Sequence, residues 1–135
     1  MNDTLDATSC APTILVVDDD ADMRFLARAV LEGSGIEIAG EAADGQEALD
    51  RLAELDPPPV PTVVLLDNQM PGLTGLEVAA RILADRPDQI IVLFSAYLDN
   101  DIIAEAERLG VAGCVSKGDA MDLARIIEDL VSQSG

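Results

Sequence analysis

The chain has 135 residues, the usual size of a single domain, and 49% of them are hydrophobic, enough to build a core. Aspartate and glutamate total 26 against 8 lysines and arginines, and the net charge of −18 argues against direct binding to nucleic acid or to an anionic membrane surface. The sequence has no histidine, which excludes a Ser-His-Asp triad, histidine-ligated zinc and a phosphohistidine on this chain.

The N-terminal segment, residues 1–12, is polar and acidic and is predicted to be a flexible tail. It has no basic stretch and does not resemble a signal peptide, and no hydrophobic run approaches the roughly 20 residues of a membrane helix. Cys10 lies in this segment and Cys114 in a predicted strand, and neither belongs to a CxxC pair. Reduced thiols and a cytoplasmic location are therefore expected.

Strand and helix signals alternate from residue 13 onward. Thr13–Val17 is a continuous hydrophobic run, typical of a strand covered on both faces. Asp20 is predicted to cap the following helix, whose end is marked by Gly33 and Gly35. Ile36–Glu41 alternates hydrophobic and acidic residues, which predicts a strand near the edge of the sheet.

The alternation continues through the middle of the chain. A capping-box pattern of Asp44 with Glu47 opens the second helix, which the three prolines at 57–59 stop. A second capping box, Thr74 with Glu77, opens the third helix. The remaining predicted strands are Thr62–Leu66, Gln89–Phe94 and Val111–Ser116.

Hydrophobic residues at helical spacing predict two further helices in the last third of the chain. One contains Ile102 and Leu109 and ends at Gly110, and the last is capped by Asp119. Five strand–helix pairs with short connections, (βα)5, indicate an α/β fold. Right-handed crossovers then make it a doubly wound, five-stranded parallel sheet.

Polar residues follow four of the five predicted strands, at the points where the hydrophobic runs end. Asp18 and Asp19 follow the first strand, and Asp67, Ser95 and Lys117 follow the third, fourth and fifth. Each alone would more often be a cap, a loop residue or a surface charge. Together they would meet at the carboxyl edge of one sheet, where open α/β folds place their ligand sites.

Three carboxylates in one pocket would repel one another, and a hard divalent cation relieves that repulsion. Mg²⁺ prefers such oxygen ligands and leaves room for a phosphoryl oxygen, and Mn²⁺ is an alternative. A carboxylate can then act as a nucleophile toward phosphorus, with a lysine as a second cation. The sequence therefore predicts a site for phosphoryl chemistry.

Four stretches of the chain resemble the receiver domain of bacterial response regulators, the chemotaxis-regulator-like proteins of two-component signalling. They are Ile14–Asp20, Leu66–Gly75, Leu93–Ala96 and Gly113–Lys117, and the Asp-x-x-Met-Pro-x-x-x-Gly pattern from Asp67 to Gly75 is the most specific part. The resemblance runs from about residue 13 to 131. It implies a receiver domain over residues 13–132 with no output domain, and the flavodoxin-like strand order 2-1-3-4-5.

The resemblance also implies a role for each site residue. Asp67 would accept a phosphoryl group from a phosphohistidine on a histidine kinase or a histidine phosphotransfer protein. Mg²⁺ would be held by the carboxylates of Asp18, Asp19 and Asp67 and the main-chain carbonyl of Gln69. Ser95 and Lys117 would each contact a phosphoryl oxygen. Gln69 and Tyr97 stand at positions that influence how fast the acyl phosphate hydrolyses. The protein would not be an enzyme beyond its own phosphorylation and dephosphorylation.

The chain departs from the family at two positions of the fifth strand and the loop after it. Cys114 stands where these proteins usually have an aromatic residue, so the output would change through the loop Ala96–Asn100 instead. Gly118 replaces a frequent proline, and a trans peptide bond is expected there. The downstream protein partner is expected to bind the surface formed by the fourth helix, the fifth strand and the fifth helix. A monomer is favoured, because some dimeric relatives have an Asp-Asp pair where this chain has Ala112-Gly113.

Three other functions compete with a phosphorylated switch. A pseudo-receiver scaffold would use the same fold without phosphorylation. An aspartate-based phosphatase would need a second aspartate two residues after its nucleophile, where this chain has Gln69, and a flavodoxin-like electron carrier would need phosphate donors where it has Asp18–Asp20. The chain is either a single-domain receiver or a piece of a longer regulator.

Overall fold

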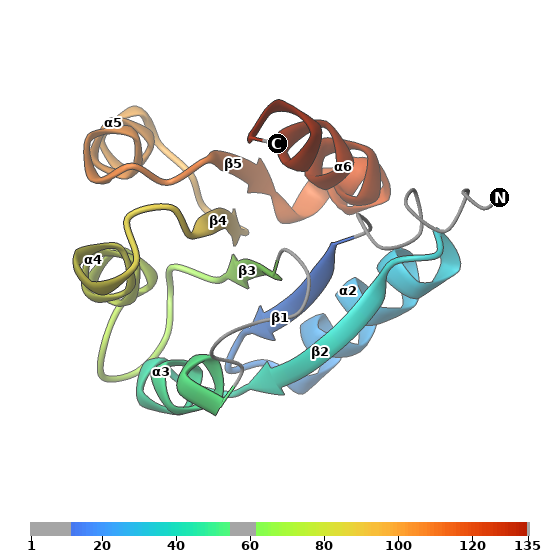
Figure 1. The fold of residues 1–135 in the computed structure, drawn as a ribbon, viewed down its shortest axis with the longest axis horizontal. Coiled ribbons are helices and arrows are strands. Elements are labelled where there is room, and N and C mark those ends of the chain that lie inside the picture. Colours follow the sequence, from blue (N-terminus) through green and yellow to red (C-terminus); the bar gives the residue numbers. More distant parts are fainter. Residues whose placement is uncertain (1–11, 55–61, 135) are drawn as a thin grey trace, which may run out of the picture.

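The computed structural model describes residues 12–54 and 62–134 and contains a five-stranded parallel sheet in the order β2-β1-β3-β4-β5 (Figure 1). The strands are β1 (Thr13–Val17), β2 (Glu37–Ala42), β3 (Thr62–Leu66), β4 (Ile90–Ser95) and β5 (Gly113–Ser116). The helices are α2 (Ala21–Gly33), α3 (Gly45–Glu54), α4 (Gly75–Asp85), α5 (Asn100–Leu109), the 3₁₀ helix η1 (Lys117–Asp122) and α6 (Leu123–Ser134). The predicted α/β class and strand order are confirmed.

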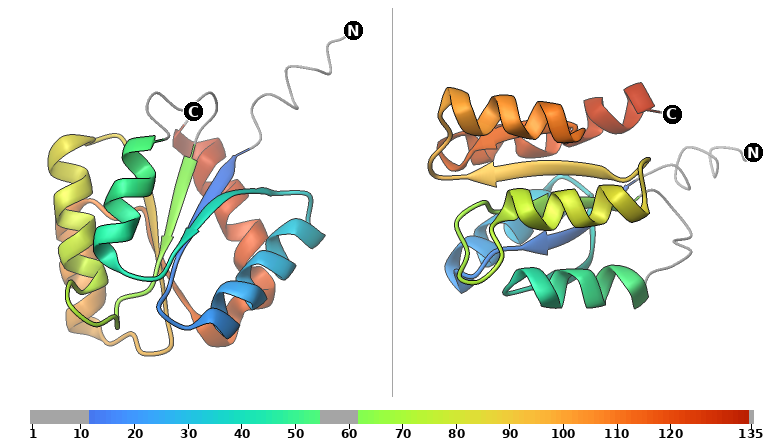
Figure 2. Two further views of the ribbon diagram at one scale, coloured as in Figure 1. Left: turned by 90° about the horizontal axis from the view of Figure 1, so that it is seen from below. Right: turned by 90° about the vertical axis from the view of Figure 1, so that its left-hand side faces the viewer.

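Helices cover both faces of this sheet, with α2 and α6 on one side and α3, α4 and α5 on the other (Figures 1 and 2). The strands sort their side chains accordingly, because successive residues of a strand point to opposite faces. Leu15 and Val17 of β1 pack in the cluster under α3, α4 and α5, whereas Ile14 and Val16 pack under α2 and α6. The central strands β1, β3 and β4 are therefore hydrophobic on both faces except at a terminal Thr or Ser, as predicted for strands covered on both faces.

The predicted helix starts are largely confirmed. The Asp20 carboxylate accepts a hydrogen bond from the N–H of Asp22, and Thr74 and Glu77 form a reciprocal capping box at α4. Asp44 accepts from the N–H of Glu47 at 2.8 Å, but the Glu47 carboxylate reaches back to the N–H of Ala43 instead of Asp44. The second helix thus has half of the predicted capping box.

One predicted helix end is found at its glycine, and another lies within a residue or two of the predicted glycines. Gly110 ends α5 with φ +101°, a left-handed conformation that favours glycine. In α2, Gly33 is the last helical residue, Ser34 is the C-cap, and Gly35 follows with φ +84°. The predicted stop at residues 57–59, Cys10 and all of the predicted tail except the buried Pro12 lie outside the described residues.

The segment between β5 and α6 corrects a prediction. The last helix does not begin at Asp119, because η1 precedes it and the Ser116 hydroxyl accepts a hydrogen bond from the N–H of Gly118 at 3.2 Å. Ala120 is buried inside this turn and packs with the α2 and α6 cluster, so α6 starts only at Leu123. The fifth strand is also shorter than predicted and starts at Gly113.

Candidate functional site

Three carboxylates meet at the carboxyl edge of the sheet. Asp18 and Asp19 follow β1 and Asp67 follows β3, and one oxygen of each lies within 4.8 Å of the others. Asp18 and Asp67 are buried, at 3% and 4% exposure, whereas Asp19 is exposed. The neighbouring positions of β1 and β3 in the strand order bring them together. The predicted convergence of these three residues is present.

Lys117 carries the positive charge of this cluster. It is the first residue after β5, and its Nζ lies 2.7 Å from Asp18 Oδ2 and 3.5 Å from Asp67 Oδ2. Only 13% of its side chain is exposed, so the ammonium is largely withdrawn from water. A lysine from the last strand therefore spans two carboxylates from the first and third strands.

The electrostatics of Asp67 suit a cation ligand. Burial raises the pKa of its carboxyl group, and the nearby Asp18 carboxylate raises it further. Lys117 and the N–H of Gln69, which donates to Asp67 Oδ1 at 3.3 Å, act in the opposite direction and do not outweigh burial. An ionised Asp67 is thus destabilised in the cluster, and a divalent cation among three carboxylate oxygens would relieve that cost.

This raised pKa predicts a pH-dependent penalty in the absence of metal. The folded chain holds the Asp67 proton more tightly than the unfolded chain, whose carboxyl pKa is about 3.9. The protonated Asp67 carboxyl group therefore contributes to the stability of the fold at low pH, and this contribution is lost as the pH rises above the pKa of the unfolded chain. Asp67→Asn should melt at a higher temperature than wild type at pH 7 in chelator, with a difference that shrinks toward pH 4. An equal or lower melting temperature at pH 7 would contradict the prediction.

The other site residues predicted from the sequence lie on β4, on β5 and in the loop that follows β4. Ser95 is the last residue of β4 and is fully buried, and its hydroxyl accepts a hydrogen bond from the N–H of Tyr97 at 3.4 Å. Tyr97 is 56% exposed. Cys114 lies in β5 and packs, partly buried, against the hydrophobic cluster under α3, α4 and α5, and burial raises the pKa of its thiol. The Ser95 hydroxyl is thus held by its own loop in this structure.

The loop that carries Asp67 is held tightly on both sides. The N–H of Asp67 donates to the Val17 carbonyl at 2.9 Å, which fixes the start of the loop to β1. Asn68 accepts hydrogen bonds from the N–H groups of Gly75 and Leu76 at 3.0 and 3.1 Å. A Cβ built on Gly75 would overlap the Asp67 carbonyl oxygen and lie 2.7 Å from Asn68 Cα. The glycine at the end of the sequence motif therefore lets α4 begin directly against the loop.

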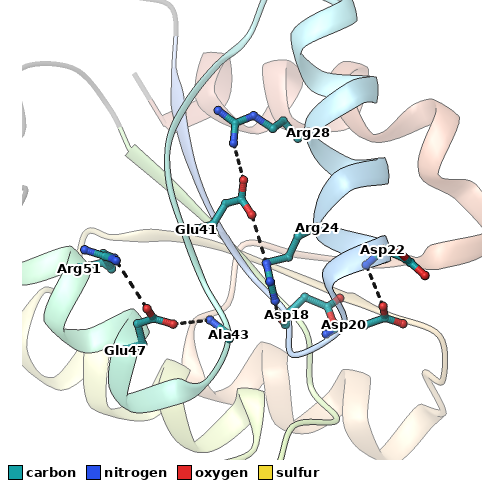
Figure 3. A network of polar contacts seen from close by, with 9 residues as sticks. All are labelled: Asp18, Asp20, Asp22, Arg24, Arg28, Glu41, Ala43, Glu47 and Arg51. Carbon is teal, nitrogen blue, oxygen red and sulfur yellow. Dashed lines mark hydrogen bonds and ion pairs between the residues drawn. The ribbon is translucent and has the colours of Figure 1, made fainter.

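One residue next to the site was missed in the sequence. Arg24 of α2 donates from Nη1 to the main-chain oxygen of Asp18 at 2.6 Å (Figure 3). A cation near the N-terminus of a helix has the wrong sign for the helix dipole, and this misfit was the available signal. Its partner on β2, Glu41, had no local signal, because the contact depends on which strands pair.

A five-stranded 2-1-3-4-5 sheet with carboxylates and a lysine at its carboxyl edge defines the class of two-component receivers. The sequence profile of the response regulator receiver domain matches residues 14–129, and the chain belongs to this family. Among the described residues no helix is long and apolar enough to cross a membrane.

Curated relatives are of several kinds. The chemotaxis protein CheY of Thermotoga maritima is 31% identical over 117 residues, which are 87% of this chain and 92% of that protein. The transcriptional regulatory protein PdtaR of Mycobacterium tuberculosis is 36% identical over 132 residues, 96% of this chain but 62% of the relative. A protein-glutamate methylesterase/protein-glutamine glutaminase of Geobacter metallireducens is 38% identical over 104 residues, which are 76% of this chain and 28% of that protein. The chain thus spans most of one relative and only part of others.

Solved structures confirm the fold. The signal receiver domain of the response regulator NarL of Mycobacterium tuberculosis superposes with a TM-score of 0.81 at 29% identity, covering 91% of this chain and 98% of that one. The response regulator domain of Thermotoga maritima CheB gives a TM-score of 0.76 at 26% identity, covering 92% and 96%.

Proposed function

We propose that this protein is a phosphorylatable switch in which Asp67 accepts a phosphoryl group from a phosphohistidine on a histidine kinase or a histidine phosphotransfer protein. The observation that carries the proposal is the buried cluster of Asp18 and Asp67 with Lys117, joined by Asp19 within 4.8 Å. A solvated helix entry would have no reason to bury two carboxylates and a lysine together.

The transfer forms one bond and breaks one bond. A carboxylate oxygen of Asp67 attacks phosphorus, the phosphorus–nitrogen bond to the donor imidazole breaks, and its electron pair stays on the ring nitrogen. Asp67 is suited to this role because it follows a central strand and its loop is fixed to β1 and α4. The product is an acyl phosphate on Asp67, which hydrolyses to restore the carboxylate.

We assign Asp18, Asp19, Asp67 and the main-chain carbonyl of Gln69 to a Mg²⁺ site, where Mn²⁺ would also fit. The bound ion would neutralise charge that develops on the phosphoryl oxygens. Lys117 would exchange its carboxylate partners for a phosphoryl oxygen, and Ser95 would turn its hydroxyl away from the N–H of Tyr97 to donate to another. The site would act only on the phosphoryl group of its own Asp67, and the expected location of the protein is the cytoplasm.

Two exposed hydrophobic side chains support docking of a protein donor beside this site. Phe25 of α2 is 74% exposed and Met121 of η1 is 83% exposed. These two helices contact each other, and α2 begins directly after Asp20 whereas η1 begins at Lys117. The position of the two side chains near Asp20 and Lys117, on two helices that contact each other, is the basis on which we place the histidine-bearing partner over α2 and η1.

The output would be a change of protein contacts on α5, β5 and α6, made by a monomer without direct nucleic-acid binding. Cys114 of β5 is too small to act as the swinging ring of relatives. We infer that the loop Ala96–Asn100 carries the change, because the Ser95 hydroxyl is bonded to the N–H of Tyr97 within that loop. A new partner for Ser95 would free the loop.

The test is intact mass after incubation with Mg²⁺ and acetyl phosphate, with Asp67→Ala as the matched control. We expect one added phosphoryl group that hydroxylamine removes and that the variant lacks. The beryllofluoride complex is measured in parallel, because it does not depend on the lifetime of the acyl phosphate. A wild type that forms neither adduct would exclude the phosphorylated switch and leave a scaffold of receiver fold.

A further inference from the structure

We propose that Arg24 is a positioning residue for the cation site, that it acts by holding the main chain of Asp18, and that Glu41 holds Arg24 in turn. The inference rests on the proposed function for the identity of the ion. It adds two residues, neither of which would touch the ion or the phosphoryl group.

The contacts form a continuous chain from the edge strand to the acidic cluster (Figure 3). Nη1 of Arg24 donates to the Asp18 main-chain oxygen at 2.6 Å, and its Nε donates to Glu41 Oε1 at 3.2 Å. The other Glu41 oxygen accepts from Nη1 of Arg28. Arg24 is 19% exposed and Glu41 31%, so this pair is shielded more than an ordinary surface ion pair.

With the contact from Arg24, every polar atom of Asp18 has a partner. Its N–H donates to the Ala42 carbonyl at 3.0 Å and its carbonyl accepts from Arg24. Its Oδ1 accepts from the N–H of Asp20 at 2.9 Å, and its Oδ2 pairs with Lys117. Arg24 supplies the one of these four contacts that comes from a side chain of α2.

An irregularity of the sheet brings Glu41 to this place. The pairing of β1 with β2 shifts between Ile14 and Leu15, so that Leu15 pairs with Gly40 and Val16 with Glu41. Without the extra residue of β2, Val16 would face a different partner and Glu41 would move along the strand. The bulge therefore places Glu41 opposite Val16, the next-to-last residue of β1.

Charge and position predict opposite effects for Arg24. As a positive charge beside three carboxylates, Arg24 should weaken cation binding, and its removal should tighten it. As a residue that fixes the main chain of the ligand Asp18, Arg24 should strengthen cation binding. Removal of Arg24 should then weaken cation binding, as removal of groups that orient metal ligands does in other proteins. The sign of the change in affinity separates the two.

The test is calorimetric titration with Mg²⁺ alone, without any phosphodonor. We expect Arg24→Ala to weaken Mg²⁺ binding about tenfold. Arg24→Lys should recover only part of that loss, because a lysine cannot bond to Asp18 and Glu41 at the same time. Arg108→Ala should leave the affinity unchanged. Arg108 is the charge-matched control, since it pairs with Glu105 on α5. Unchanged or tighter binding by Arg24→Ala would overturn the proposal.

A second variant keeps the test decisive if Arg24→Ala unfolds. Glu41→Gln keeps Arg24 but weakens the ion pair that holds its side chain. Glu37→Gln is the matched control, because it removes the same charge from an exposed position of β2. Weaker Mg²⁺ binding by Glu41→Gln than by Glu37→Gln is expected, and equal affinities would overturn the proposal. A wild type that binds Mg²⁺ but takes no phosphoryl group would defeat the proposed function and leave this inference standing.

Discussion

Lys117→Met should bind Mg²⁺ more tightly than wild type and yet accept a phosphoryl group about 100-fold more slowly. The two effects have opposite signs because Lys117 has two roles. In the structure its ammonium lies 2.7 Å from Asp18 and neutralises the carboxylates that a cation would otherwise bind. In the reaction it would stabilise charge on the phosphoryl group.

The side chain of methionine is similar in length and keeps the space filled, so the change removes mainly the charge. Removing a positive charge from the cluster leaves Asp18 and Asp67 without their shared partner, which strengthens their attraction for a divalent ion. During transfer, the loss of one preorganised donor to developing charge typically costs a factor of 100 to 1,000 in rate.

The measurements are calorimetry with Mg²⁺ and the rate of mass increase with acetyl phosphate at saturating Mg²⁺. Arg125→Met is the matched control, because Arg125 is an exposed cation on α6 paired with Asp122. Weaker Mg²⁺ binding, or a phosphorylation rate within threefold of wild type, would show that Lys117 does not have the role assigned to it.

Gly75→Ala should destabilise the protein by about 3 kcal/mol, the upper part of the range for overpacked sites. The added Cβ would overlap the Asp67 carbonyl oxygen and crowd Asn68 Cα at 2.7 Å. Both are main-chain atoms of a loop that is fixed at two points, because the N–H of Asp67 donates to Val17 and the carbonyl of Asn68 accepts from Gly75, so neither atom can move aside cheaply. The loop that presents the Asp67 carboxylate would have to shift, and phosphoryl uptake should fall with stability.

Gly33→Ala is the matched control for this substitution. Gly33 is the last residue of α2, and a Cβ there would meet nothing within 4 Å. Urea unfolding should show a stability equal to or slightly above wild type for Gly33→Ala, because alanine favours a helix. A Gly75→Ala protein as stable as Gly33→Ala would mean that the loop after Asp67 is less constrained than its contacts indicate.

The sequence predicted the fold and the core of the site for a simple reason. Each strand is a hydrophobic run that ends at a polar residue, and parallel strands align those ends at one edge of the sheet. Asp18, Asp67 and Lys117 are near one another because of this rule, although they are far apart in the chain. The helix caps at Asp20 and Thr74 are local and were equally readable.

What the sequence did not reveal depends on competition between local signals or on contacts across the sheet. Asp119 is a good N-cap by type, but Ser116 caps a 3₁₀ turn first and the buried Ala120 holds that turn in place. The contact of Arg24 with Glu41 depends on strand order and on a bulge in β2. No spacing along the chain encodes either of them.

The direction of the strands has a practical consequence for experiments on this protein. β1 begins and α6 ends at the sheet edge opposite the acidic cluster, which lies where the strands end (Figure 2). A reporter or a surface tether joined beyond either of these two elements would therefore leave the cluster turned toward solution. Immobilised protein should accept soluble donors from the free side, which makes single-molecule and biosensor measurements of phosphotransfer practicable.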